Sequence, residues 1–313
     1  MNKKVISYIM LTGSSIIFGF SFLFTKDALT HLDLFQMLGL RFLIAALILT
    51  VLAFARVIKI SLTRSKIKAM LPLVVLQPLV YFVGETYGIK LTSSSESGMM
   101  IALMPIAIAL FSIKILNERL VLRQWIAVMA SVVGVAMIIG ANGFSGTSGN
   151  LLGYLLLLVA VAAEGMYAPL AKKHMATKCT PVEVTFLIMC GGAIAFNAAG
   201  LLVAAVAGEM RTYFTDALKI EVLSGLLYLS VASSVVAFFC INFALSKVRA
   251  SASASFCNLT TVVSVLAGVL LGGEKLHMLQ IAGMVLILIS IWGVVSDGTP
   301  RIKEEVSEIL LKS

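Results

Sequence analysis

The chain has 313 residues, of which 60% are hydrophobic and 12% charged, and its mean hydropathy is +1.04. Soluble domains carry about 25% charged residues, and a soluble fold this apolar would expose large hydrophobic patches. The composition therefore excludes a soluble globular protein and indicates an integral membrane protein.

Ten apolar segments of about 20 residues follow one another along the chain, with short loops between them. A helix of that length crosses a hydrocarbon core of about 30 Å at 1.5 Å per residue. The segments cover residues 5–25, 34–55, 69–89, 93–114, 122–141, 151–171, 182–207, 221–245, 250–272 and 277–296. The sequence predicts an all-α polytopic membrane protein with ten transmembrane helices and a charged tail over residues 297–313.

The formal net charge of +9 arises from basic residues that gather on one side of the predicted membrane. If the N-terminus is cytoplasmic, 18 of the 24 Lys and Arg residues fall on the cytoplasmic side and five on the other, while Arg41 lies within a span. Cytoplasmic loops of membrane proteins carry such an excess of basic residues. The pattern predicts a multi-pass protein of the cell (cytoplasmic) membrane with both termini in the cytoplasm. It gives no indication of a nucleic-acid partner.

Residues 94–139 recur weakly as residues 250–295, at a constant shift of 156. The clearest pairs are Glu118 with Glu274, Leu120 with Leu276, and Gln124 with Gln280. A shift that covers five helices, an odd number, places the second copy in the membrane the other way up. Inverted repeats are typical of secondary transporters, which bind substrate between the halves near the midplane. The predicted domains are a first five-helix repeat over 1–146, a second, inverted repeat over 147–296, and the cytoplasmic tail over 297–313.

The stretches LNERLVLRQWIAVMASVVGVAMII and LGGEKLHMLQIAGMVLILISIWGVV close the two halves. With the ten spans, they resemble the EamA family of the drug/metabolite transporter (DMT) superfamily over roughly residues 7–296. The resemblance implies a ten-helix fold with both termini cytoplasmic, and export or uptake of small metabolites, often amino acids. Members commonly carry a proline in the fourth helix of each half, whereas this chain has Pro105 in the first half and Thr261 in the second.

Two runs of small residues, Ser93–Gly98 and Ala250–Ser255, begin the fourth span of each half. Small side chains allow the backbones of neighbouring helices to approach closely in lipid. Both runs are predicted to be tight helix crossings. Glu118 and Glu274 sit in short loops before a helix, where a carboxylate favours a positive helix end, so their predicted role is structural.

Three charged residues are predicted in the outer third of the membrane, namely Arg41, Glu85 and Glu96. A charge at the bilayer centre costs about 2.5–3.5 kcal/mol on the insertion scale, so such residues normally face a partner or a cavity. The three are expected to form one buried charge network. Three explanations are open: Arg41 neutralises a carboxylate and fixes helix packing, one glutamate changes its partner or protonation during transport, or the charged side chains snorkel to the membrane interface.

Glu164 lies past the midplane of its span, with no basic residue at a comparable depth in the other spans. Because burial disfavours the charged form, we expect this carboxyl group to be protonated or to face water. Tyr167 lies three positions on, on the same helix face, and Pro169 removes one backbone hydrogen bond nearby. Glu164 and Tyr167 are candidates for substrate or proton binding, and a protonated packing residue is the alternative for Glu164.

Two stripes of residues recur every four positions, one on the third span and one on the eighth, and a shift of 157 relates them. Together with one residue of the ninth span, they are the predicted lining of a central cavity for substrate binding or coupling. The residues are Gln77, Tyr81 and Glu85, then Ser234, Phe238 and Asn242, and lastly Asn258. Structural hydrogen bonding alone is the alternative explanation.

These features favour a secondary transporter, an exporter or exchanger of small metabolites such as amino acids, that works by alternating access. Protons are a candidate coupling ion, and a homodimer is a candidate assembly. The alternative is a membrane-embedded enzyme or a channel-like facilitator. The chain has no phosphate-binding loop for ATP, its three histidines lie in predicted loops, and its four cysteines are scattered. We therefore expect no catalytic residues, no cofactor and no metal site.

Overall fold

The computed structural model describes residues 3–116, 122–145, 151–177, 179–208, 210, 212–216, 219–247 and 256–295. All regular secondary structure within these residues is helical. The predicted all-α class is confirmed, and the tail over 297–313 lies outside the described residues.

The first half of the chain begins with two long helices, α1 (Lys3–Ala28) and α2 (Leu34–Phe54). A third long helix passes from α3 (Arg64–Val74) through the π-helical segment η1 (Val75–Tyr81) into α4 (Phe82–Leu91). The next helix is broken into α5 (Ser94–Ile101) and α6 (Met104–Ile115). The break falls before Pro105, which lacks the N–H that a continuous helix would need. The last helix of this half is α7 (Leu122–Ser145).

The second half follows a similar order. It begins with α8 (Leu151–Thr177), α9 (Pro181–Ala207) and the short α10 (Thr212–Thr215). A third long helix again contains a π-helical segment, passing from α11 (Ile220–Leu227) through η3 (Tyr228–Ala237) into α12 (Phe238–Lys247). The described residues end with α14 (Cys257–Leu270) and α15 (Met278–Val295).

Seven helical segments of the described residues are long and apolar enough to cross a membrane. They are Ile6–Ala28, Leu34–Phe54, Arg64–Leu91, Ser94–Ile115, Leu151–Ala176, Pro181–Ala207 and Val222–Lys247. Three apolar helices are shorter, namely Trp125–Ala141, Cys257–Leu270 and Met278–Ser290. Each of the ten predicted spans overlaps one of these segments. The number that cross the membrane, and their inverted arrangement, remain predictions.

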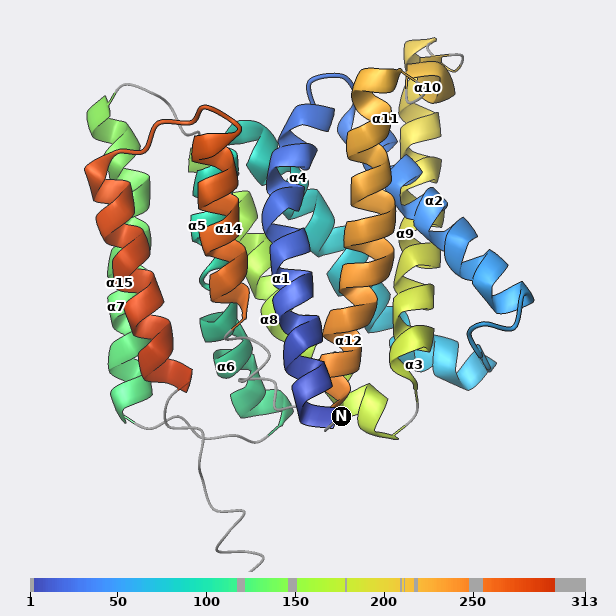
Figure 1. Cartoon of the computed structure of the whole chain (residues 1–313), viewed down its shortest axis with the longest axis horizontal. Helices are drawn as coiled ribbons and strands as arrows, with labels where there is room; N and C mark the ends of the chain where they lie inside the picture. Colours follow the sequence, from blue (N-terminus) through green and yellow to red (C-terminus); the bar gives the residue numbers. More distant parts are fainter. Residues whose placement is uncertain are drawn as a thin grey trace, which may run out of the picture.

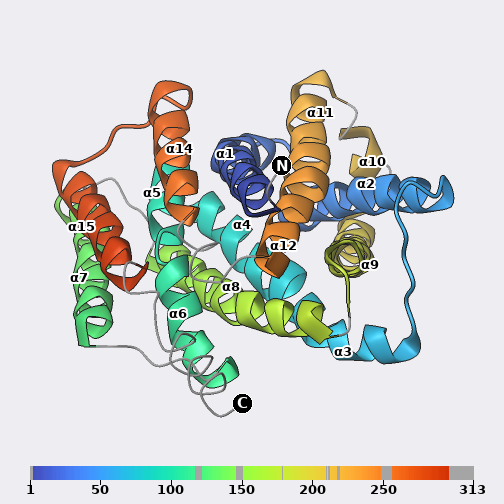
Figure 2. The ribbon, with the colours of Figure 1, turned by 60° about the horizontal axis from the view of Figure 1, so that its bottom comes forward.

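Helices from opposite halves of the chain lie side by side. At one edge of the molecule α7 packs along α15, and at the other edge α2 lies beside α9 (Figures 1 and 2). The α7–α15 contact depends on two glycines, because a Cβ on Gly134 would lie 2.8 Å from the Gly283 carbonyl oxygen, and one on Gly283 would lie 2.6 Å from that of Gly134. Between the two edges, α5 lies beside α14, and α1 beside α12.

The run Ser93–Gly98 makes the close helix crossing predicted for it. A Cβ on Gly98 would collide with the Ser264 side chain of α14, and the Ser264 hydroxyl donates to the Ser94 carbonyl oxygen at 3.0 Å. Thr261 also joins these helices, since its hydroxyl donates to the Gly98 carbonyl oxygen at 3.0 Å. The second predicted crossing, Ala250–Ser255, and the loop residue Glu118 lie outside the described residues.

Candidate functional site

A central cavity of about 80 Å³ lies among α1, α2, η1, α4, α5, α6, α8, α12 and α14. Eight of the eleven residues predicted for the cavity and the charge network line it: Arg41, Gln77, Tyr81, Glu85, Glu164, Tyr167, Phe238 and Asn242. They come from both halves of the chain, so the cavity is an interface between them. Ser234 lies directly behind Arg41, whereas Glu96 and Asn258 are not among the lining residues.

Arg41 is almost fully buried, with 2% of its surface exposed, and it is held by serines of η3. Its Nε donates to Ser234 Oγ and its Nη2 donates to Ser233 Oγ, both at 2.8 Å. The guanidinium carbon also lies 4.7 Å from the centre of the Phe82 ring, within the range of a cation–π contact. The direct partners of Arg41 are therefore two hydroxyls and a ring, and Glu85 is its charged neighbour.

Glu85 and Tyr81 lie one helical turn apart, across the end of η1. The Tyr81 hydroxyl donates to Glu85 Oε1 at 2.6 Å, and both side chains are buried. A carboxylate that accepts a short hydrogen bond and lies near a guanidinium is well stabilised within a helix bundle. Tyr81 and Glu85 thus form a buried hydrogen-bonded pair, and the charge network of Arg41, Glu85 and Glu96 stays a prediction.

The structure places Glu96 in a different set of contacts from the predicted one. Its Oε2 accepts from the Ser93 backbone N–H at 3.0 Å, which forms a capping box at the start of α5. Its Oε1 accepts from Gln280 Nε2 of α15 at 2.7 Å. Glu96 therefore caps the start of α5 and links it to α15.

Glu164 projects from the middle of α8 into the cavity, opposite η1. Gln77, Glu85 and Tyr81 are its polar neighbours. Two buried oxygens of this group, Glu164 Oε2 and Gln77 Oε1, have no hydrogen-bond partner within the described structure. Buried polar atoms are nearly always paired in folded proteins, so unpaired acceptors on a cavity wall are notable.

Tyr167 and Asn242 connect three helices below Glu164. The Tyr167 hydroxyl donates to Asn242 Oδ1 at 2.9 Å, and Asn242 Nδ2 donates to Thr185 Oγ1 of α9 at 3.1 Å. All three side chains are buried. The network fixes the orientation of the Tyr167 ring against the cavity. Asn258 is half-buried in α14 and its Oδ1 has no partner within the described residues.

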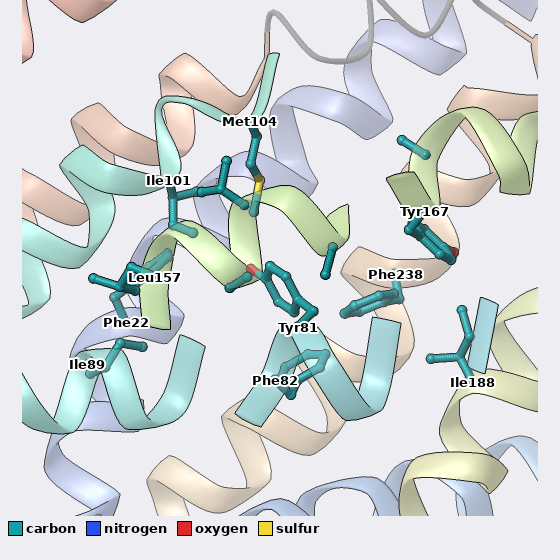
Figure 3. Packing of buried hydrophobic residues seen from close by; sticks show 14 of the residues in the cluster. Phe22, Tyr81, Phe82, Ile89, Ile101, Met104, Leu157, Tyr167, Ile188 and Phe238 are labelled. Carbon is teal, nitrogen blue, oxygen red and sulfur yellow. The ribbon is translucent and has the colours of Figure 1, made fainter. Parts of the chain in front are cut away.

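Aromatic rings form much of the remaining cavity wall. Figure 3 shows the rings of Tyr81, Phe82 and Phe238 gathered together, with Tyr167 on the far side of Phe238. The ring centres of Tyr81 and Phe82 are 5.1 Å apart, and those of Phe82 and Phe238 are 5.9 Å apart. The cavity thus combines a few charged groups with a mainly apolar wall, as small-molecule sites commonly do.

One wall of the cavity was not predicted from the sequence. It belongs to α1, and the residues that line it are Leu11, Ser14, Ser15, Phe18, Ser21 and Phe22. Their spacing of three, four, seven, ten and eleven positions from Leu11 is that of one helix face. Serines recurring along one face of an otherwise apolar span would have been the signal.

Glu274 also has a role that its position in the sequence does not reveal. Its Oε1 accepts from the Ser94 backbone N–H and its Oε2 from that of Ser95, both at 2.8 Å. The carboxylate therefore caps α5, a helix of the other half, although it precedes α15 in the chain. Lys26 of α1 donates to the carbonyl oxygens of Ile89 and Thr92 nearby.

Helices that enclose a charged cavity, in a chain this apolar, define a multi-pass membrane protein with an internal polar site. The family model of the EamA-like transporter family matches residues 5–140 and again residues 151–296. The chain therefore belongs to the EamA-like transporter family, and the resemblance noted in the sequence is confirmed. Membership implies a membrane transporter with a small-molecule substrate.

Relatives cover nearly the whole chain. The uncharacterized transporter YcxC of Bacillus subtilis (strain 168) is 33% identical over 292 residues, which are 93% of this chain and 93% of the relative. The uncharacterized transporter YetK of the same organism is 26% identical over 90% of this chain and 85% of its own. A solved crystal structure of a protein with 17% identity aligns with a TM-score of 0.61 over 94% of this chain and 96% of that one, which supports the fold alone.

Proposed function

We propose that the protein is a secondary transporter that carries small metabolites such as amino acids across the cytoplasmic membrane, as an exporter or exchanger. The observation that carries this proposal is the central cavity, which unites Arg41 and Glu85 of the first half with Glu164 of the second. Opposite charges on the walls of one cavity suit a small cargo that has both a cationic and an anionic group.

The cavity serves alternating access if the two halves, 1–146 and 147–296, are inverted repeats that rock about it. The two separate matches to the family model support this division. So do the π-helical segments η1 and η3, because each occurs in the third long helix of its half and each contributes residues to the cavity or its immediate surroundings. Single π-helical turns are frequent at functional sites.

The cargo site that we propose consists of the predicted residues that line the cavity. Glu164 and Gln77 offer acceptors, Arg41 offers a guanidinium, and the rings of Tyr81 and Phe238 bound the space between them. Buried carboxylates also provide a place for a proton, so the proposal includes exchange of cargo against protons.

The test is transport by the purified protein in liposomes. Metabolite profiling of overexpressing and deletion cells first selects the cargo. Labelled cargo is then loaded on one side, with and without a pH gradient, and with and without unlabelled cargo on the other side. A carrier should show saturation and faster flux against unlabelled cargo, and proton exchange should make the flux respond to the gradient. A channel-like facilitator would give flux that unlabelled cargo does not accelerate, and an enzyme would return chemically altered cargo.

The proposed orientation, with both termini cytoplasmic, has its own test. Single cysteines placed in 142–150 or 209–219 should react with an impermeant maleimide added to intact cells, whereas those in 59–68 or 172–178 should not. Labelling of 59–68 from outside would reverse the orientation. The described segment 59–68, which includes the start of α3, holds several of the basic residues that motivate the assignment.

A further inference from the structure

The central cavity contains two acceptor oxygens that nothing in the described protein satisfies. Glu164 Oε2 belongs to α8 in the second half, and Gln77 Oε1 belongs to η1 in the first. Both residues line the cavity, and Gln77 is only 3% exposed. The two side chains line the same cavity from opposite halves of the chain, so both unpaired oxygens belong to one cavity that lies between the halves.

Unpaired acceptors are complementary to a donor. Folding leaves a buried acceptor unsatisfied only at a cost in stability, and a bound donor would remove that cost. An organic ammonium group provides three N–H donors and a positive charge, which match a carboxylate oxygen and an amide oxygen. A neutral hydroxyl provides one donor and no charge, so it fits this group less well.

The surroundings favour an organic ammonium over a metal ion. Hard metal cations collect six or more oxygen ligands, and no cluster of three or more His, Cys, Asp or Glu side chains able to hold a metal occurs in the described part of the chain. The cavity wall instead includes the aromatic rings of Tyr81, Tyr167 and Phe238. Aromatic faces attract cations and accommodate the carbon skeleton that carries an amine.

The other charged groups of the cavity each have hydrogen-bond partners within the protein. Glu85 Oε1 accepts from the Tyr81 hydroxyl, and Arg41 donates to Ser233 and Ser234. Glu164 is the cavity carboxylate that has a fully buried oxygen, Oε2, without a partner in the described residues.

We propose that Glu164 Oε2 and Gln77 Oε1 form an ammonium subsite, which binds the protonated primary amine of the cargo. This inference rests on the proposed transport function for its biological meaning, but the binding itself is measurable without transport. The subsite assigns the cargo to the organic amines, with the amine lying between the two halves of the protein.

The experiment measures binding to the purified, detergent-solubilised protein by thermal stabilisation and by competition with radiolabelled phenethylamine. Three probes share one carbon skeleton: phenethylamine, 2-phenylethanol and 3-phenylpropionate. The wild-type protein should bind phenethylamine saturably and at least tenfold more tightly than either of the others. Glu164→Gln and Gln77→Leu should each weaken phenethylamine binding at least tenfold. Two independent variants keep the test decisive if one of them does not fold.

Thr86→Val is the matched control. Thr86 is fully buried and its hydroxyl also has no partner in the described structure, but it does not line the cavity. Removing that hydroxyl should leave phenethylamine binding within twofold of wild type. Equal loss in this variant would mean that any change of buried polarity disturbs binding, and it would overturn the subsite.

Other outcomes also decide the matter. Equal affinity for the amine and the alcohol, or unchanged amine binding in Glu164→Gln, would overturn the proposal. If sodium chloride displaced phenethylamine much more strongly than potassium chloride did, in a Glu164-dependent manner, the site would belong to a metal cation. If Glu164→Gln lost only the response of transport to a pH gradient and kept its affinity for amines, Glu164 would be a coupling residue.

The two proposals fail separately. Transport of a cargo that has no amine would retain the transport function and overturn the subsite. Glu164-dependent binding of phenethylamine by a protein that moves no metabolite in liposomes would retain the subsite and overturn the transport function.

Discussion

Replacing Glu274 by Gln should weaken the link between α5 and the segment that joins α14 to α15. The Glu274 carboxylate accepts two backbone N–H groups, those of Ser94 and Ser95, each at 2.8 Å. A hydrogen bond to a charged group contributes about 1.5–3 kcal/mol. The Gln side chain has one acceptor oxygen, so it loses one of these bonds and points an amide N–H₂ at a backbone donor. We expect the free energy of unfolding to fall by about 1.5–3 kcal/mol, which is about a 10- to 150-fold change in the folding equilibrium.

The assay is reversible unfolding in mixed micelles, with increasing sodium dodecyl sulfate, followed by circular dichroism. Lys275→Gln is the matched control, because it also removes one charge, at the next residue, from an exposed side chain. This control should unfold at the wild-type detergent fraction within error. If Glu274→Gln unfolded together with the wild type and the control, the carboxylate would contribute nothing measurable to α5, and the reasoning from its two short hydrogen bonds would be wrong.

Two further predictions concern buried contacts. Arg41→Ala should lower the yield of folded protein measured by size-exclusion chromatography, because it leaves the Glu85 carboxylate without its charged neighbour at a cost of several kcal/mol. Adding Glu85→Gln should recover part of that yield. Strictly additive losses would show that the two residues are not coupled. Gly134→Ala should lower the thermal unfolding temperature, because its Cβ would lie 2.8 Å from the Gly283 carbonyl oxygen. Gly140→Ala on the same helix is the control and should be neutral or stabilising, because a Cβ there meets nothing within 4 Å. Equal shifts in the two variants would refute the close packing.

The helices and much of the cavity could be predicted from the sequence, because both depend on local patterns. A run of apolar residues long enough to cross a bilayer is visible without any partner. Likewise, Gln77, Tyr81 and Glu85 recur every four residues and so lie on one face of their helix whatever packs against it. The cavity then lies where such faces meet, and two of them come from corresponding helices of the halves.

The partners of the charged residues could not be predicted, because they depend on which helices pack together. The serines that hold Arg41 are 192 and 193 residues away in the chain, and the N–H groups that Glu274 accepts are 179 and 180 residues away. The prediction for Glu96 used depth in the membrane alone, which places residues at one level but not on one face. Depth and sequence spacing therefore do not identify the partner of a charged residue when three or more helices could supply that partner.

The chemistry of the cavity is divided unequally between the halves, although both contribute their first and third long helices to it. In the third helices, a shift of 157 pairs Gln77 with Ser234, Tyr81 with Phe238, and Glu85 with Asn242. A carboxylate on one side therefore corresponds to an amide on the other, and the second half brings its own carboxylate, Glu164, from α8. On the proposed mechanism, a cargo held between unlike walls keeps one orientation, while the helices that carry those walls are alike enough to exchange roles as the halves rock. Selectivity then resides in a few side chains and movement in the shared scaffold, which is why the family fold is compatible with many cargoes and does not by itself identify this one.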